Sequence, residues 1–191
     1  AASGQTLTDA RDLFSGCESL QQADLGRWDF TETADISGMF EKCTRLKEAA
    51  FGEESVHAKD ASGMFLDCSN LQSVSLPGLD AGTLVNLKEM FKGCASLKEI
   101  DLTRFDTSNV ADMSNMFEGC DALKELDLSG FDTSNVWDQG MEVGGRGTRL
   151  KKVTAPGVIG QDFSCVVKGR RNSRQITIDY AMEPGCEIPV W

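Results

Sequence analysis

Five cysteines recur along the chain at nearly fixed spacings of 26, 25, 26 and 26 residues. They are Cys17, Cys43, Cys68, Cys94 and Cys120. Each lies in the same short sequence motif: Met or Leu, then Phe, two variable residues, Cys, two more variable residues and Leu. A fixed period in this range is typical of proteins built from stacked structural repeats. We number the repeat copies 1 to 5 by these cysteines.

Two of the copies are nearly the same sequence. Residues 88–110 and 114–136 agree at 15 of 23 positions. The chain has 191 residues, which is enough for one domain with a sizeable core. The repeat therefore constrains the fold more tightly than any other feature of the sequence.

The first part of each copy has the apolar spacing of a helix. Val110, Met113, Met116 and Phe117 stand at i, i+3, i+6 and i+7, which places them on one helical face. The spacing predicts one short helix in every copy.

The polar residues around this segment also suit a helix. Asn109 and Asp112 resemble a capping box, and Gly93 and Gly119 stand where a helix C-cap is expected. The aspartates that recur at the position of Asp112 also resemble metal ligands, but capping explains them more simply.

The second part of each copy predicts a strand. In Leu97–Leu102, the apolar residues Ile100 and Leu102 flank an outward Asp101. The equivalent segments begin at Leu20, Leu46, Leu71, Leu123 and Leu150. The Asp, Ser and Thr side chains of the turn at 105–108 are expected to bond nearby backbone N–H groups.

One copy cannot bury its own Leu, Met and Phe side chains, whereas stacked copies form a continuous core. We therefore predict an α/β solenoid with one short parallel strand and one short helix per coil. Residues 1–154 are expected to form about five full coils and a degenerate sixth. Residues 155–191 follow no repeat and are predicted to be a C-terminal cap with a strand at 175–180, or the start of a further segment.

The repeat cysteines are predicted to be free. Equivalent side chains in neighbouring coils lie about 4.8 Å apart or more and run nearly parallel, whereas a disulfide needs Cβ atoms about 3.8 Å apart that face each other. Buried thiols that pack as small apolar groups fit this better. Cys165 and Cys186 lie outside the repeat, and whether they pair is left open.

The net charge of the chain and the motifs that it lacks argue against several classes of function. The net charge of −11 argues against nucleic acid and anionic membranes as partners, and no apolar run approaches the roughly 18 residues of a membrane helix. No catalytic, phosphate-binding or metal-binding motif is present, and the single histidine, His57, is interpreted as a surface turn residue. We expect a protein that is not an enzyme and has no cofactor, and we expect it to be a monomer.

Three columns of outward strand positions are candidates for binding. The first column is Gln21, Lys47, Gln72, Lys98, Lys124 and Lys151. The second is Gln22, Glu48, Ser73, Glu99, Glu125 and Lys152. The third is Asp24, Ala50, Ser75, Asp101, Asp127 and Thr154.

The predicted partner-binding residues come from the two most regular copies: Lys98, Glu99, Asp101, Lys124, Glu125 and Asp127. Solenoids commonly bind ligands on this face, although the same columns also suit a merely solvated surface. A Ca²⁺ bridge between Asp101 and Asp127 is a minor option, because Ca²⁺ usually takes 6–8 oxygens. One basic cluster lies outside the columns and is interpreted as a solvated loop or a contact for an acidic partner: Lys168, Arg170, Arg171 and Arg174.

The repeat resembles a known family. The pattern L-x-x-L-D-L followed by F-D-T-S-N-V-x-D-M-S-x-M-F-x-x-C is similar to the 25-to-26-residue repeat of BspA-like bacterial surface proteins, which also occurs in mycoplasma surface lipoproteins. The likeness is close at 88–136 and looser at 5–87, where Trp28 replaces the turn Phe. It implies a leucine-rich-repeat-like, right-handed stack.

The resemblance also implies a location and a role. It suggests an extracellular or cell-surface module that adheres to a host or bacterial surface protein. A structural spacer that holds another domain off the cell surface is the alternative, because one solenoid fold serves many functions.

Overall fold

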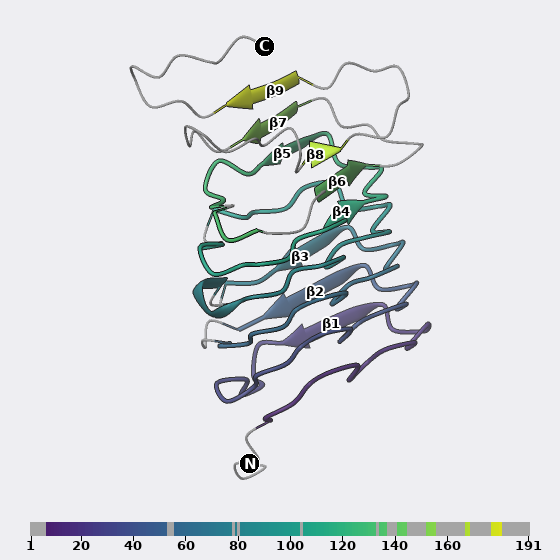
Figure 1. Ribbon diagram of the computed structural model, residues 1–191. Helices are drawn as coiled ribbons and strands as arrows, with labels where there is room; N and C mark the ends of the chain where they lie inside the picture. Colours follow the sequence, from purple (N-terminus) through teal and green to yellow (C-terminus); the bar gives the residue numbers. More distant parts are fainter. Residues whose placement is uncertain are drawn as a thin grey trace.

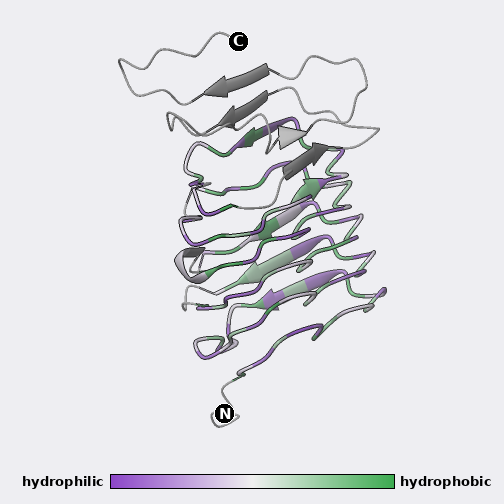
Figure 2. Ribbon diagram, in the orientation of Figure 1, coloured by the Kyte–Doolittle hydropathy of each residue, from purple (hydrophilic) through white to green (hydrophobic). Residues whose placement is uncertain are grey.

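The computed structural model describes residues 7–52, 56–77, 79, 81–103, 105–132 and 134–136, together with four strands nearer the C-terminus. Successive repeat copies lie side by side in one stack, which runs from the N-terminal copy to the strands near the C-terminus (Figure 1). Apolar residues recur at the same places in successive copies, so that each copy contributes to one continuous core (Figure 2).

The strands are short and form three parallel sheets. The first sheet contains β1 (Gln22–Leu25), β2 (Glu48–Phe51) and β3 (Ser73–Ser75) in that order. The second contains β4 (Phe117–Glu118), β6 (Met141–Gly144) and β8 (Val167–Lys168). The third contains β5 (Glu125–Asp127), β7 (Lys152–Ala155) and β9 (Thr177–Tyr180).

The prediction of parallel strands is confirmed in most copies. β1 pairs with β2 and β2 with β3, each in parallel, and β5 pairs with β7 in the same way. The segment at 97–102 is the exception: it is not a strand, and its Lys98 N–H reaches the Gln72 carbonyl only at 3.5 Å. The first and third sheets are therefore separated at copy 4.

The structure tests one of the predictions made for the C-terminal part of the chain. The strand expected at 175–180 is present as β9, which adds to β7 in parallel. The division of the chain at residue 154, and the choice between a cap and a further segment, stay predictions. Cys165, Cys186, Arg170, Arg171 and Arg174 lie outside the described residues.

The predicted helices are wrong. Within the described residues there is no α-helix, and the one helical segment is the short 3₁₀ turn η1 (Ala81–Thr83). The segments expected to be helical are instead runs dominated by tight turns, at 10–17, 36–43, 61–68, 87–94 and 113–120, the last of which also contains β4. We call these five runs the turn ladder.

Hydrogen bonding explains the difference. In a helix, each N–H donates to the carbonyl four residues earlier in the same segment. In the turn ladder, the Phe40 N–H donates to the Met64 carbonyl of the next copy at 2.8 Å, and the Cys43 N–H closes a turn onto the Phe40 carbonyl at 3.0 Å. Alternate N–H groups thus bond to a neighbouring copy, and no N–H remains for a helix.

Each stretch of the turn ladder contains two residues with left-handed backbone, four positions apart. In copy 2 they are Gly38 (φ 59°) and Lys42 (φ 58°). Gly93 (φ 75°) and Gly119 (φ 78°) occupy the second of these positions, so they form turns and are not helix C-caps.

A column of stacked phenylalanines runs through the buried core. Neighbouring ring centroids along the column lie 5.2–5.6 Å apart, with planes within 12° of parallel. The column contains Phe14, Phe40, Phe65, Phe91 and Phe117. All except the half-buried Phe14 are fully buried, which confirms the predicted core.

Candidate protein-interaction face

The six predicted partner-binding residues are all exposed, and they lie in two adjacent copies. Lys124, Glu125 and Asp127 lie on or beside β5, and Lys98, Glu99 and Asp101 occupy the equivalent positions of copy 4. The intervening leucines point into the core: Leu97, Leu102, Leu123, Leu126 and Leu128 are buried. The charged residues of these segments are exposed while the leucines are buried, and we call this outer surface the strand face.

The columns are aligned as predicted wherever strands pair. Gln22 lies beside Glu48, and Glu48 beside Ser73. In the third sheet, Glu125 pairs with Lys152, and Asp127 with Thr154.

The first column is aligned through backbone bonds. Lys47 N–H donates to the Gln21 carbonyl, and Gln72 N–H donates to the Lys47 carbonyl, both at 2.8 Å. Equivalent side chains in successive copies are therefore neighbours, as the repeat predicts.

The aspartates of the third column are fixed by their own turns. Asp101 Oδ1 accepts hydrogen bonds from the Thr103 N–H at 3.0 Å and the Thr103 hydroxyl at 2.7 Å. Asp127 Oδ1 accepts from the Ser129 N–H at 2.9 Å. These Asx turns were missed in the sequence, although the recurring Asp-x-Ser/Thr pattern contains the signal. The two carboxylates consequently have defined positions on the strand face.

Charge alternates across the strand face. The Lys column immediately precedes, in sequence, the column that contains Glu99 and Glu125, and the described side chains of both columns are exposed. In the first sheet, the side-chain amide of Gln22 donates a hydrogen bond to Glu48 Oε2 at 3.1 Å. The strand face therefore exposes both signs of charge, and the Asp101 and Asp127 carboxylates are held by turn hydrogen bonds.

The opposite side of the stack carries the column of Asp and Asn that suggested helix capping. Asp35 Oδ1 accepts from the Ser37 N–H at 2.9 Å, and Asp112 Oδ1 accepts from the Ser114 N–H at 2.8 Å. The same bond recurs at Asp9, Asp60 and Asn86. These residues form Asx turns and no capping box, because there is no helix to cap. Asn109, the expected N-cap, donates its side-chain amide to the Gly82 carbonyl at 2.8 Å.

A shallow hollow lies over the turn ladder, and the sequence analysis missed it. Its lining includes Arg11 of copy 1, the glycines Gly38 and Gly63, and Lys88 and Glu89 of copy 4. Nearby, Lys92 bridges Glu89 at 2.9 Å and Glu118 at 3.1 Å.

The part of the chain that the structure describes holds no cluster of three or more His, Cys, Asp or Glu side chains that could bind a metal ion. It also holds no helix long and apolar enough to cross a membrane. His57 is exposed, as expected for a turn residue.

The repeat cysteines are free thiols, as predicted, and four of them are fully buried. Burial raises the pKa of Cys43 to about 11 and that of Cys68 to about 12. Burial also raises the pKa of Cys120 to about 12 and that of Cys94 well above its ordinary value. Nucleophilic attack and metal binding both require the ionised thiolate. These buried, protonated thiols are therefore poor nucleophiles and poor metal ligands. Cys17 in copy 1 is exposed.

Comparison with known proteins gives one match. The family model described as "Mycoplasma protein of unknown function, DUF285" matches residues 4–76 and again residues 59–142. No curated protein and no solved structure matches the chain. The two overlapping matches cover the same stretch of chain as the cysteine repeat.

Proposed function

We propose that this chain, which belongs to the DUF285 family of mycoplasma proteins of unknown function, is a non-catalytic protein–protein interaction module of the cell surface. Its partner would be an extracellular protein of a host or of a bacterium. The proposal includes the finer fold assignment, a right-handed leucine-rich-repeat-like solenoid of the BspA-like type. The parallel strands and the aligned copies support that assignment.

The strand face carries this proposal. Six charged side chains in two adjacent copies are exposed together, while the alternating leucines hold the backbone against the core: Lys98, Glu99, Asp101, Lys124, Glu125 and Asp127. A rigid, regularly spaced polar surface loses little conformational entropy when it binds, which favours recognition of another folded surface.

The composition of the face suggests the kind of binding. Lys, Glu and Asp rarely contribute strongly to affinity unless water is excluded from them. We therefore expect weak binding that strengthens when several sites engage at once and weakens as salt is added.

The test is a pull-down from host extracellular proteins and from bacterial surface proteins. It compares the wild-type chain with a fourfold variant, Lys98→Glu, Glu99→Lys, Lys124→Glu and Glu125→Lys, which keeps the net charge. The wild type is expected to capture a specific protein that the variant loses. Failure of the wild type to capture any specific protein contradicts the proposal.

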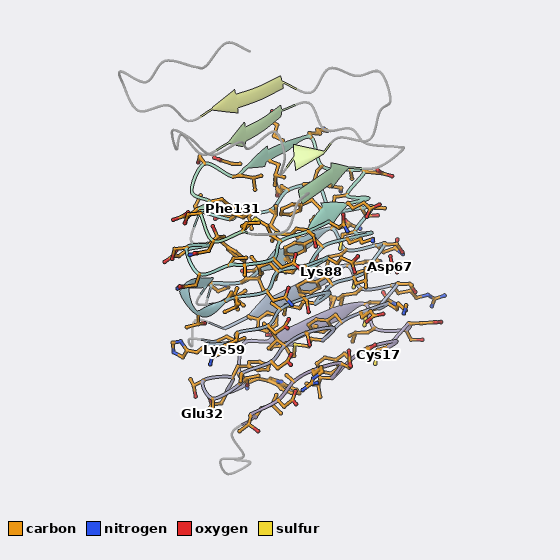
Figure 3. The ribbon with its side chains drawn as sticks, in the orientation of Figure 1. Cys17, Glu32, Lys59, Asp67, Lys88 and Phe131 are labelled. Atoms are coloured by element: carbon orange, nitrogen blue, oxygen red, sulfur yellow. The ribbon has the colours of Figure 1, made fainter. Side chains whose placement is uncertain are left out.

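A matched control exchanges charges elsewhere. Glu32 and Lys59 are exposed. Both lie on the lateral edge of the stack that faces away from the edge with Cys17 and Asp67 (Figure 3). Glu32→Lys with Lys59→Glu keeps the net charge and should leave capture unchanged. Equal capture by the wild type and the strand-face variant would exclude the strand face as the binding surface.

A second candidate function is a structural spacer. Its support is the backbone ladder between copies, which makes the described part of the chain a regular stack held by neighbour-to-neighbour bonds. A spacer would tolerate the fourfold charge exchange in any assay of the whole protein and would show no selective capture.

A further inference from the structure

The junction between copies 4 and 5 is bonded unevenly around the stack. On the turn-ladder side, four N–H groups of copy 4 donate to carbonyl oxygens of copy 5 at 2.7–3.0 Å: those of Leu87, Glu89, Phe91 and Gly93. In the core beside them, Phe91 stacks on Phe117 with ring centroids 5.6 Å apart. The turn-ladder side of this junction is therefore joined as regularly as at the other copies.

The strand side of the same junction lacks such bonds. Among the described residues, no backbone hydrogen bond joins 97–102 of copy 4 to 123–128 of copy 5. The nearest one runs from the Ala122 N–H to the Ala95 carbonyl at 3.1 Å, just before these segments. The two copies are thus in register where the segments begin, but the segments themselves are not bonded to each other.

The equivalent N–H groups of the first column show how the strand side weakens along the stack. The N–H groups of Lys47 in copy 2 and Gln72 in copy 3 each donate to the preceding copy at 2.8 Å. That of Lys98 in copy 4 does so only at 3.5 Å, and that of Lys124 in copy 5 makes no such bond. The loss of pairing is complete between copies 4 and 5.

Like charges occupy equivalent positions at this junction. Lys98 and Lys124 belong to the first column and Glu99 and Glu125 to the second, and all four side chains are exposed. Within the described residues, no ion pair neutralises any of these four charges. Like charges at directly opposite positions destabilise the pairing of neighbouring strands.

The junctions at which strands do pair carry different residues in the second column. Between β1 and β2, the Gln22 amide donates to Glu48 Oε2 at 3.1 Å, and between β2 and β3, Glu48 lies beside Ser73. Between β5 and β7, the register places Glu125 beside Lys152, a residue of opposite charge. Two glutamates stand together only where pairing is lost.

We propose that the strand side of the junction between copies 4 and 5 is a charge-controlled hinge. Repulsion within the lysine pair and the glutamate pair holds the two strand segments apart, and the turn ladder is the pivot. When salt screens these charges, the segments approach each other. The Lys124 N–H then donates to copy 4, as its equivalents donate in copies 2 and 3.

The hinge lies within the strand face. Copies 4 and 5 each carry half of the six predicted partner-binding residues, so the hinge sets the spacing between the two halves. The rigidity that favours binding would then depend on ionic conditions at this one junction. That consequence rests on the proposed function, whereas the hinge itself does not.

Amide hydrogen exchange of the full chain, resolved by residue, tests the hinge without any partner. At about 0.01 M NaCl, the Lys124 amide should exchange much faster than the Gln72 amide. At about 1 M NaCl the Debye length is roughly 3 Å, and Lys124 exchange relative to Gln72 should slow by about tenfold or more. The amides of Leu87 and Phe91 should stay protected in both conditions, because their bonds form the pivot.

A variant with fewer charges should act as salt does. Lys98→Gln with Glu99→Gln removes one charge of each sign, keeps the net charge and relieves both like-charge pairs. Its Lys124 amide should exchange slowly already at low salt. The matched control, Glu32→Gln with Lys59→Gln, removes the same charges at the lateral edge of the stack, and its Lys124 amide should exchange as in the wild type.

Three results would overturn the proposal. Slow exchange of the wild-type Lys124 amide at low salt would mean that the segments are already paired. Fast exchange that salt does not slow would mean that charge is not the cause. Equal exchange of the Phe91 and Lys124 amides would mean that whole copies separate without a pivot.

The salt titration uses the wild-type chain, so a variant that fails to fold does not remove the test. It also needs no binding partner. The hinge can therefore fail while the pull-down captures a protein, and the pull-down can fail while the hinge is confirmed.

Discussion

The thiol of Cys94 donates a hydrogen bond to the backbone carbonyl of Phe65, one copy earlier, across 3.2 Å. The same oxygen also accepts the Cys68 N–H at 3.1 Å. This relationship gives a physical reason for a cysteine at the centre of every copy. The position needs a small apolar side chain that also carries a donor, and alanine or valine would supply only the first.

The thiol contact predicts a difference between two substitutions. Cys94→Ala removes volume and the donor, and we expect it to cost about 1–3 kcal/mol of unfolding free energy. Cys94→Ser keeps a donor with a shorter reach and adds polarity to a buried site. Cys94→Val keeps apolar bulk without the donor. Urea unfolding should rank wild type above all three, and a Cys94→Val protein as stable as wild type would show that the hydrogen bond contributes nothing.

Stability should fall in alkali because of these thiols. Burial raises the pKa of Cys68 to about 12 in the folded chain, against an ordinary value of 9.0. Below pH 9 both states keep the proton, so that stability is fully present. Between about pH 9 and 12 the unfolded thiol ionises first, and stability is lost. The urea midpoint should therefore drop between pH 8.5 and 11, and it should drop less in Cys68→Ala. An equal drop in both proteins would assign the effect to other groups.

Thiol accessibility gives an independent check on the same burial. Among the five repeat cysteines, iodoacetamide followed by peptide mapping should modify Cys17 in the native chain. Cys43, Cys68, Cys94 and Cys120 should react only after unfolding, because they are buried and un-ionised. A disulfide between Cys94 and Cys120 in thiol-blocked native protein would contradict both the burial and the register.

The phenylalanine column should carry much of the stability. Phe91 is fully buried between Phe65 and Phe117, with both centroid distances at 5.6 Å. Phe91→Ala is expected to cost about 3–5 kcal/mol in urea unfolding. Phe14→Ala is the control at the partly exposed end of the column and should cost about 1–2 kcal/mol. A cost below about 1 kcal/mol at Phe91 would mean that the column is not core.

Two glycines test the left-handed turns. Gly63 has φ 58°, and a Cβ there would meet only the Leu66 side chain at 3.6 Å, so that Gly63→Ala adds backbone strain without a clash. We expect Gly63→Ala to lower the unfolding free energy by about 1 kcal/mol. The strain of alanine in a left-handed conformation destabilises the folded chain, and the smaller conformational entropy of the unfolded chain offsets part of that loss. Gly130 lacks a positive φ and has open space around its Cα, so Gly130→Ala should be neutral or slightly stabilising. Equal effects in thermal unfolding would contradict the assigned turn.

The sequence predicted the repeat, the alignment of its copies and the buried positions. Phe91, Cys94 and Leu97 are core residues because a strict period puts every copy in the same environment. The outward columns followed for the same reason, since equivalent positions of successive copies share one environment. Exposure of Lys98 and Glu99 could therefore be predicted without a structure, whereas the Asx turn that fixes Asp101 was overlooked.

The helix could not be predicted correctly from apolar spacing alone. Met113, Met116 and Phe117 have a spacing that suits both a helix and a row of tight turns. What decides between them is where the N–H groups bond, and that depends on the neighbouring copy. One local signal did point away from a helix: Gly38 and Gly63 stand in the middle of the expected helices, where glycine is unfavourable.

The hydrogen bonds between copies in the turn ladder also determine how the stack would respond to force. These bonds run along the stack, so a pull that separates the two ends stretches the bonds of every junction along their own direction, and the weakest junction should open first, at low force. A pull across the stack, along the strands, loads the bonds of a junction together in shear and should meet much greater resistance. The mechanical resistance of the stack should therefore be anisotropic: low along the stack and high along the strands. The points at which the chain is attached would decide which of these two resistances opposes an applied force.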